Sequence, residues 1–388
     1  MTDGPIKSIP YHVNWLAADK GRIREEIAYL ADRGFTHVKV SPAWFRLQPR
    51  PLQVDRVVMA TLEACYDAMH RAGIASITTL LTAGYMGHLE LPDWHHAADV
   101  VGWLQGRTST PIYRRGGSIR VNGVMRRLQL ANPYRTDTFR DGQRELIRVV
   151  MGYFAGHPAA RHWLLAPGWS YLADVAPAVA QAWWQELTGL ARRVHAGAVL
   201  LTQIDGPQLI GHGFDAGMAG REVDMVCVDT AMPLLPHRRR RLPFLPMRFL
   251  RYVVAGLTKR PTLIGMHPIV RGSTSGWESM MWYDRRVAVP VVTDAQLVDL
   301  WHAHMAVLQH HAVAGVVYPR GWQVGFDGDR DVIGDKLADI TGDSVYRQLD
   351  AMMREWQHIG VIHDSFDDER YRYQPQKELW RLWHEFSE

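Results

Sequence analysis

A short β-branched segment, Phe35-Thr36-His37-Val38-Lys39-Val40-Ser41-Pro42, lies between two helical patterns near the start of the chain. Apolar and polar residues alternate along it, which is typical of a β-strand, and its Ser-Pro pair ends the strand. An apolar run at 9–15 and an amphipathic stretch at 22–33 come before it. A helical pattern at 55–71 and a second apolar run at 74–82 come after it. The beginning of the chain therefore predicts the order strand, helix, strand, helix, strand.

The same alternation continues along the rest of the chain. Further strands are predicted at 162–166, 198–204, 225–228, 262–266 and 313–318. Further helices are predicted near 137–154, 175–194, 245–257 and 294–311. Parallel strands need crossovers of this length, and eight such strands close into a (β/α)8 TIM barrel. An open doubly wound sheet would place a glycine-rich phosphate turn after the first strand, whereas residues 14–19 contain no glycine. The sequence therefore predicts an α/β protein built as a TIM barrel.

The spacing of the strands predicts a single barrel domain over residues 1–388 with three long loop insertions. These insertions follow strands 3, 7 and 8, at 83–136, 267–293 and 319–344. The chain contains no internal repeat and no linker. Residues 345–388 are expected to add C-terminal helices that pack on the barrel exterior through Trp356, Trp380 and Trp383.

The composition excludes several classes of protein. With 388 residues, of which 47% are hydrophobic and 22% charged, the chain is neither disordered, nor collagen-like, nor a small disulfide-stapled domain. The formal net charge of +4 is mild, and much of it lies in the Arg238–Arg241 run. This run is either a solvated loop or a contact for a phosphate or an acidic polymer. No nucleic-acid-binding motif accompanies it.

Cysteine and histidine usage argues against disulfides and cofactors. Cys65 and Cys227 are the two cysteines, so no disulfide framework is predicted and a reducing compartment is favoured. The N-terminus lacks an apolar signal core, and no run of 18 apolar residues occurs, so we expect a cytoplasmic protein without a membrane span. The histidines at 95–96 and 302–304 lack the spacing of a metal site, and neither a metal nor another cofactor is expected.

Tryptophan is unusually frequent, with 15 residues. Many aromatic residues follow the predicted strands directly: Trp15, Trp44, Phe45, Tyr85, Trp94, Trp169, Trp277, Trp282 and Trp322. In a barrel these positions gather around the C-terminal ends of the strands, where the functional residues lie. Each ring taken alone can be loop packing. As a set on one rim, the rings favour a cleft in which indole faces stack on the apolar faces of sugar rings.

Several segments resemble one family of enzymes. The segments at 35–49, 79–94, 132–137, 157–163 and 259–264 resemble clan A glycoside hydrolases, above all the cellulases and β-mannanases of family 5. The similarity runs over most of the chain and in the same order. It implies a TIM barrel and a retaining mechanism, in which one carboxylate is the acid/base and another is the nucleophile.

The residues that carry this chemistry in the family are replaced. By the resemblance, the acid/base position falls on Gly168 and the nucleophile position on Met266. Lys39 stands where the family has an arginine, and Tyr85 where it has a histidine. The histidine and tyrosine of strand six have no counterpart in 228–233. Glycine and methionine can neither donate the proton nor attack the anomeric carbon, so ordinary retaining hydrolysis is predicted to be absent.

Three carboxylates near predicted strand ends are candidates for a relocated catalytic pair. Asp205 follows strand five, Asp229 follows strand six, and Glu278 lies in the loop after strand seven. Asp205 and Asp229 come from adjacent strands, so a close pair with one raised pKa is geometrically reasonable. The alternative is structural: Asp205 caps a turn and Asp229 braces the vacated site by hydrogen bonds.

These patterns leave three functional hypotheses. The leading one is a non-hydrolysing, carbohydrate-binding or regulatory pseudoenzyme, whose ligand is an oligosaccharide, a polysaccharide or a glycosylated small molecule. The second is an active glycosidase or other sugar-modifying enzyme that uses the relocated carboxylates. The third is an oligomeric structural protein with its tryptophan-rich rim as the interface. The residues expected to bind substrate are Trp15, Trp44, Lys39, Tyr85, Trp94, Trp169, His267, Trp277 and Trp322.

Overall fold

The computed structural model gives the fold of most of the first two thirds of the chain. It describes residues 6–11, 13, 15–16, 18–32, 34–85, 88–92, 94, 119–121, 124–126, 133–169, 176–204, 208, 216–229, 254–265, 270–271, 276–282, 285–292 and 313–317.

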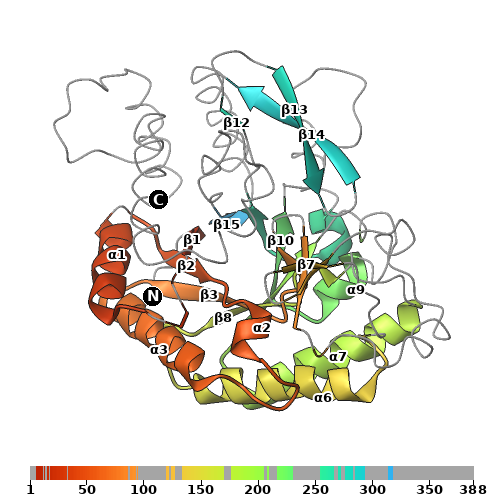
Figure 1. Cartoon of the computed structure of the whole chain (residues 1–388), viewed down its shortest axis with the longest axis horizontal. Helices are drawn as coiled ribbons and strands as arrows, with labels where there is room; N and C mark the ends of the chain where they lie inside the picture. Colours follow the sequence, from red (N-terminus) through yellow and green to blue (C-terminus); the bar gives the residue numbers. More distant parts are fainter. Residues whose placement is uncertain are drawn as a thin grey trace.

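Eight parallel strands close into a barrel (Figure 1). They are β1 (Ile6–Tyr11), β2 (His37–Val40), β3 (Ala75–Leu80), β8 (His162–Leu165), β9 (Val199–Ile204), β10 (Met225–Asp229), β11 (Thr262–Gly265) and β15 (Val313–Val317). Each strand pairs with the next in chain order, and β15 pairs with β1. All eight predicted strands and the predicted TIM barrel are thus confirmed, and the doubly wound alternative is excluded.

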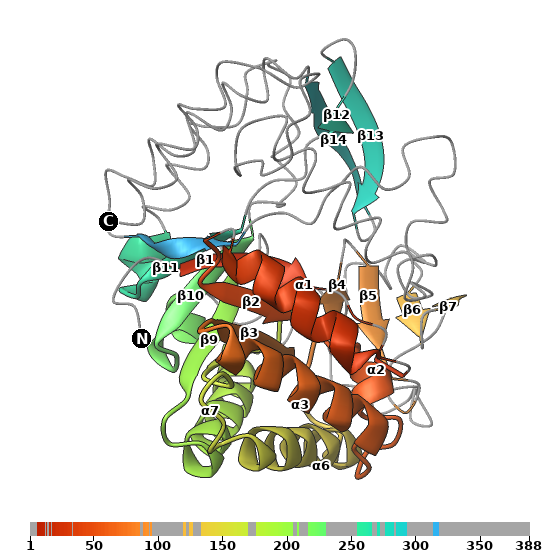
Figure 2. The same ribbon diagram turned by 90° about the vertical axis from the view of Figure 1, so that its left-hand side faces the viewer.

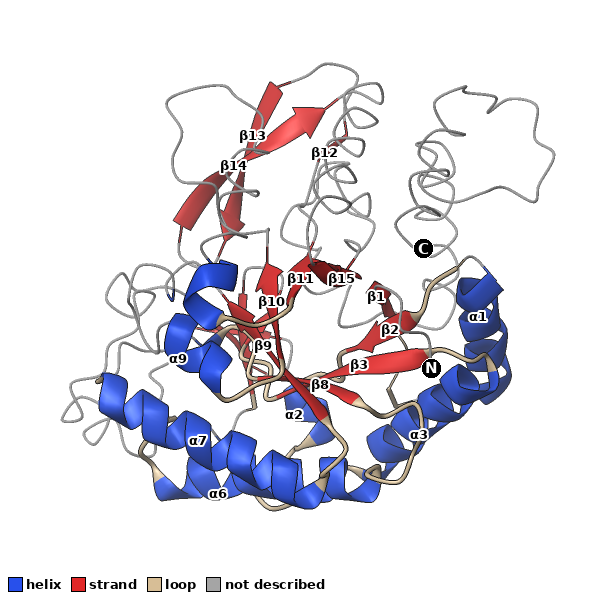
Figure 3. Ribbon diagram, turned by 180° about the vertical axis from the view of Figure 1, so that it is seen from behind, coloured by secondary structure: helices blue, strands red, loops and turns tan. Residues whose placement is uncertain are grey.

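Helices cover the outside of the barrel. They are α1 (Lys20–Asp32), α2 (Trp44–Leu47), α3 (Arg56–Arg71), α6 (Asp137–Leu146), the π-helix η2 (Ile147–Met151), α7 (Pro177–Val194) and α9 (Ala216–Arg221). In Figure 2, α1 and α3 lie side by side on one flank, and in Figure 3, α6 and α7 lie side by side on another. The helices predicted near 22–33, 55–71, 137–154 and 175–194 are confirmed, whereas α2 and α9 were not predicted. The helix predicted at 294–311, and most of that at 245–257, lie outside the described residues.

Local chemistry accounts for two of the helix starts. The carboxylate of Asp55 accepts hydrogen bonds from the backbone N–H groups of Val57 and Val58, at 2.8 and 3.0 Å, so it caps the otherwise unpaired N-terminal amides of α3. Pro177 occupies the first turn of α7, where its missing N–H costs no hydrogen bond and its fixed φ suits the helix. Both signals are local, so sequence alone places these boundaries well.

Two of the predicted loop insertions contain small sheets. In the insertion after β3, a four-stranded sheet is formed by β4 (Gly84–Tyr85), β5 (His88–Leu91), β6 (Ile119–Val121) and β7 (Val124–Arg126). After β11, β12 (Val270–Arg271), β13 (Gly276–Trp282) and β14 (Arg285–Val292) form a three-stranded sheet that stands apart from the barrel in Figure 3. The insertion expected at 319–344 and the C-terminal helices expected at 345–388, with Trp356, Trp380 and Trp383, lie outside the described residues.

The core has two parts. Inside the barrel, six strands each contribute one apolar side chain to a compact cluster: Ile6, Ile77, Leu164, Leu201, Cys227 and Leu263. A larger cluster fills the layer between the strands and the helices. Cys65 lies in this outer layer, and both cysteines are buried and form no disulfide. None of the described helices is both long enough and apolar enough to cross a lipid bilayer.

Candidate functional site

The inner face of the barrel also carries polar side chains next to its apolar cluster. Lys39 on β2 is in register with Ile77 on β3, which lines the barrel interior. Residues in register on parallel strands point to the same face, so the Lys39 side chain enters the barrel near the C-terminal end of β2. Its neighbours Val38 and Val40 alternate to the opposite face, in the outer core. Thr79, in register with Leu164, adds a hydroxyl whose Oγ1 lies 3.4 Å from the Val40 carbonyl oxygen.

The ends of β3 and β8 are held together by an irregular backbone. The Ala166 N–H donates to the Leu80 carbonyl at 2.9 Å, and the Ala83 N–H donates to the Pro167 carbonyl at 3.0 Å. Leu81 and Ala166 have left-handed φ angles of 56° and 53°, and Gly168 has a φ of 79°. Such angles are unfavourable for residues other than glycine, so the chain leaves both strands through strained turns. Gly168 is buried within this turn.

The structure describes the backbone of two of the three candidate carboxylates. Asp229 is the last residue of β10, and it is in register with Gly265 on β11. Glu278 lies in β13, in register with Val289 of β14, rather than in a loop as expected. Asp205 lies outside the described residues, as do Met266, His267 and Trp322. The pairing of Asp205 with Asp229 therefore stays a prediction.

Five of the aromatic residues expected to bind a sugar fall into two groups, one in the inserted sheets and one in the core. Tyr85 lies in β4 and Trp277 in β13, where Trp277 is in register with Pro290. Trp15, Trp44 and Trp169 are 6%, 2% and 0% exposed and belong to the outer core. The faces of these three indoles are covered by protein. This differs from the expectation that they line an open rim.

Trp44 and Trp169 belong to a continuous aromatic cluster, which we call the indole cluster: Trp44, Trp94, Tyr134, Phe139, Trp169, Trp183 and Trp184. Trp169 stacks on Trp183 with ring centroids 4.5 Å apart and an interplanar angle of 27°. Trp44 contacts Trp94 edge to face at 5.8 Å and Trp169 at 5.9 Å. These offset and edge-on geometries are the favoured packing of aromatic rings in a core. The cluster joins α2, the insertion after β3, α6, the turn after β8, and α7.

Every indole N–H of this cluster donates to a protein acceptor. The N–H of Trp44 reaches the Gln48 side-chain oxygen, and that of Trp94 reaches the Gln48 carbonyl. The remaining three indoles donate to Leu81 O (Trp169), Gln143 Oε1 (Trp183) and Ala219 O (Trp184). Indoles whose faces and N–H groups are all used by the protein have nothing left to offer a ligand. The abundant tryptophan therefore reflects packing at these positions.

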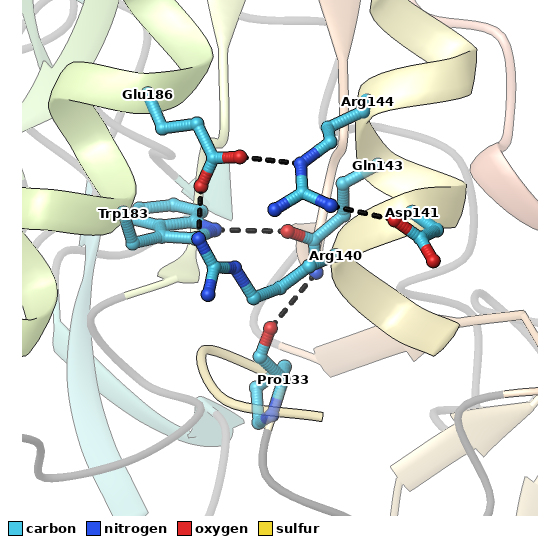
Figure 4. A network of polar contacts seen from close by, with 7 residues as sticks. All are labelled: Pro133, Arg140, Asp141, Gln143, Arg144, Trp183 and Glu186. Atoms are coloured by element: carbon cyan, nitrogen blue, oxygen red, sulfur yellow. Dashed lines mark hydrogen bonds and ion pairs between the residues drawn. The ribbon is translucent and has the colours of Figure 1, made fainter. Parts of the chain in front are cut away.

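A charged network braces the indole cluster from outside (Figure 4). Glu186 on α7 accepts hydrogen bonds from Arg140 and Arg144 on α6. Next to it, the Gln143 side-chain oxygen accepts the Trp183 N–H at 2.8 Å. Burial raises the pKa of Glu186, but the hydrogen bonds from Arg144 and Arg140 outweigh burial and leave that pKa below its usual value. Sequence reasoning missed this network, for which the arginines spaced four residues apart on one helix face were the available signal.

Two half-buried histidines meet inside the barrel near the N-terminal ends of the strands. The rings of His37 on β2 and His162 on β8 lie edge to face with centroids 4.8 Å apart. Burial lowers the pKa of His37 to about 3, and the neighbouring His162 contributes to this shift. Burial also lowers the pKa of His162 to about 4, with a contribution from Arg161. Both rings are neutral at pH 7, and they lie at the end of the barrel opposite to the mouth.

A buried carboxylate occurs in the outer layer. Glu26 on α1 accepts a hydrogen bond from the Tyr11 hydroxyl and another from Arg22 Nε at 3.0 Å. Burial raises the pKa of Glu26 and that of Tyr11. Tyr11 packs in the outer core, so this group ties β1 to α1 and does not face the barrel interior. The described residues contain no group of three histidine, cysteine, aspartate or glutamate side chains arranged to hold a metal ion.

Comparison with known proteins gives the fold a precedent. No protein-family model matches the chain, and no curated protein matches it in sequence. Among solved structures, a GH5_18 protein from Streptomyces cattleya in complex with GlcNAc matches with a TM-score of 0.60 and 15% identity, over 92% of this chain and 81% of that one. A GH5_18 protein from Bifidobacterium longum subsp. infantis matches with a TM-score of 0.60 and 15% identity, over 87% and 78%.

An exo-beta-1,4-mannosidase from Opitutaceae bacterium strain TAV5 matches with a TM-score of 0.59 and 14% identity, over 98% of this chain and 66% of that one. The barrel is thus structurally similar to glycoside hydrolases of family 5, including mannosidases. At this level of identity the similarity establishes the fold alone.

Proposed function

We propose that this protein binds a saccharide at the C-terminal mouth of its barrel and does not carry out ordinary retaining hydrolysis. The observation that carries the proposal is Gly168. By the resemblance to family 5 it occupies the acid/base position, and it is buried with a φ of 79°. The structural similarity to family 5 proteins, one of them in complex with GlcNAc, supports a saccharide as the ligand class.

The backbone at residue 168 argues against an acid/base there. A retaining glycosidase needs two carboxyl groups about 5 Å apart, on either side of the scissile bond. Glycine supplies no carboxyl group. An L-residue at this left-handed φ costs about 1–2 kcal/mol, and a buried unpaired carboxylate costs several times more. The turn after β8 thus suits glycine and does not suit a glutamate.

Sugar stacking then depends on the aromatic residues outside the indole cluster. Tyr85 and Trp277 lie in the sheets of the first two insertions, and Trp322 is predicted after β15. Trp15, Trp44 and Trp169 are assigned to packing, because their side chains are buried. Trp94 is partly buried and belongs to the same packing unit.

The second candidate function is catalysis with a relocated carboxylate, and the position of Asp229 favours it. Asp229 ends β10, in register with Gly265, which directly precedes the nucleophile position Met266. A carboxylate on β10 would therefore start one strand away from the site of the usual nucleophile. Asp205 or Glu278 would have to supply the second carboxyl group.

One experiment separates the two functions. The wild-type chain and Asp229→Asn are assayed for binding of β-1,4-linked mannose and glucose oligosaccharides by calorimetry, and for release of 4-nitrophenol from aryl β-glycosides. The matched control is Asp141→Asn, an exposed carboxylate on α6. Binding without turnover supports the proposed function. Turnover that is lost in Asp229→Asn and kept in Asp141→Asn refutes the pseudoenzyme proposal and establishes the second function.

A further inference from the structure

Lys39 is a cation inside the barrel mouth. Its register with Ile77 on one side and Pro10 on the other places it on the inner face, at the third of the four residues of β2. Its side chain is half-buried. An ammonium group on the inner face has lost part of its water, and that loss is compensated only when an anion or several acceptors approach it.

The backbone of Lys39 pairs with β1 and β3, but no hydrogen bond or ion pair connects its side chain to the residues that the structure describes. The described carboxylates with strong partners lie on the outside of the barrel and are engaged elsewhere. Glu26 binds Arg22 and Tyr11, and Glu186 binds Arg140 and Arg144. Asp55 caps α3, and Asp224 binds Arg192 and the Leu200 N–H. Asp229 also ends a strand at the mouth, but its strand β10 lies four strands away from β2 around the barrel. The described residues therefore show no counter-ion for the positive charge of Lys39.

A second polar group without a partner lies on the adjacent strand. Thr82 follows β3, the strand that pairs with β2. Its Oγ1 is shielded from solvent and has no hydrogen-bond partner. Buried hydroxyl groups in proteins are nearly always paired with protein, water or ligand. Thr82 lies five residues beyond Ile77, the register partner of Lys39, so the cation and the hydroxyl can bind different oxygens of one ligand that lies along this edge of the barrel.

We infer that the mouth selects a saccharide that carries an anionic group, a carboxylate or a phosphate ester, that Lys39 receives that group, and that the Thr82 hydroxyl binds another oxygen of the same ligand. This inference rests on the proposed saccharide-binding function and gives it a substrate class. Lysine offers a compact point charge, whereas arginine offers a planar fork suited to orienting a protein carboxylate. With glycine at 168 and methionine at 266 no such carboxylate has to be oriented, and the charge is available to the ligand.

The test measures charge preference at Lys39. Wild type, Lys39→Met and Lys39→Arg are titrated with methyl β-glucuronide against methyl β-glucoside, and with mannose 6-phosphate against mannose, by calorimetry at low salt. Acetate and inorganic phosphate are titrated alone to separate recognition of the sugar from recognition of the ion. Lys20→Met, an exposed lysine at the start of α1, is the matched control. Thr82→Val tests the hydroxyl.

In wild type the anionic member of at least one pair binds tenfold or more tighter than the neutral member, about the value of one charge-assisted hydrogen bond. This preference disappears in Lys39→Met and persists in Lys39→Arg and Lys20→Met, whereas Thr82→Val weakens the binding of both members of each pair. The titrations with methyl β-glucuronide and with mannose 6-phosphate identify which anion Lys39 binds. Circular dichroism and the unfolding midpoint confirm that each variant is folded.

Two results would overturn the inference. Equal binding of neutral and anionic sugars refutes it and leaves the proposed function intact. A charge preference that survives in Lys39→Met refutes the role of Lys39. If no sugar of either charge binds, the proposed function fails and the inference fails with it. Hydrolysis of the glycosides refutes only the proposed absence of turnover, because charge preference is then measured on KM.

Discussion

Replacing Gln48 by leucine removes a fully buried polar side chain that connects three parts of the protein. Its Oε1 accepts the Trp44 N–H at 2.8 Å. Its Nε2 donates to the carbonyl oxygens of Pro51 and Gly142, both at 2.6 Å. Gln48 is 0% exposed, so no water from bulk solvent can replace these partners. The variant therefore leaves the Trp44 N–H and the Gly142 carbonyl buried without partners, and the half-buried Pro51 carbonyl without its protein donor.

The expected loss of stability follows from these three groups. Each buried polar group without a partner costs about 1–3 kcal/mol. Burying leucine in place of glutamine returns about 1.5–3 kcal/mol. The net expectation is a loss of about 3 kcal/mol in the free energy of unfolding, which is a large fraction of the stability of an ordinary domain.

Urea unfolding at pH 7 measures this loss, with tryptophan fluorescence and circular dichroism as parallel probes. The matched control is Gln53→Leu, an exposed glutamine five residues along the chain, which is expected to change stability by less than about 0.5 kcal/mol. If Gln48→Leu lies within about 1 kcal/mol of wild type while the control behaves as expected, Gln48 does not hold the indole cluster together and the packing role argued for these tryptophans is refuted.

Three further predictions concern pH, backbone strain and charge. In the folded state the pKa of His37 is about 3 and that of His162 about 4, below the usual value of 6.5. The unfolded chain therefore binds more protons than the folded chain at acidic pH. The free energy of unfolding falls as the pH drops below 6.5, by up to about 1.4 kcal/mol per pH unit for each ring. Urea unfolding at pH 7, 6 and 5 shows this slope, and His162→Phe reduces it; a flat profile would contradict the buried neutral pair. Gly168→Ala lowers the free energy of unfolding by about 1–2 kcal/mol, because residue 168 has a positive φ. The control Gly156→Ala lies at an exposed site with nothing within 4 Å of the added Cβ, so it is near neutral or stabilising. Equal melting temperatures of the two variants would argue against the strained turn. Glu186→Gln costs about 1 kcal/mol, because the network is partly exposed, and the loss shrinks in 1 M salt; a salt-independent loss would point to packing instead.

Most of the barrel is readable from the sequence because its signals are local. Each strand, such as His37–Val40 or Val199–Ile204, is a short apolar run between helical patterns, and the predicted boundaries agree with the structure within a few residues. Asp55 marks the start of α3 through a cap that spans three residues. The β13–β14 hairpin is not predictable in this way, because no tight Asn-Gly type of turn marks it between Trp282 and Arg285.

The candidate site can be predicted only in part from the sequence. Lys39 was named from its place in the resemblance, and the structure adds that it shares the inner face with Ile77. Thr82 was not singled out, since nothing in its neighbourhood in the sequence distinguishes an unpaired hydroxyl from a satisfied one. Gly168 was recognised as a departure from the family, and its left-handed backbone became visible only in the folded chain.

The tryptophans show where sequence information ends. Their number, and their positions just after strands, follow from the chain alone, and both indicated a rim of indoles at the mouth of a barrel. Whether an indole faces solvent or core depends on segments that lie far away in the chain: Trp169 donates to Leu81, 88 residues earlier, and Gln48, the acceptor for Trp44, also binds Gly142, 94 residues later. Strand and helix patterns report hydrogen bonds and burial over a few neighbouring residues, so they specified the barrel. The burial of Trp44 and Trp169 required the insertion, the turn after β8, and helices α6 and α7 to meet, and no periodicity in the sequence encodes that meeting.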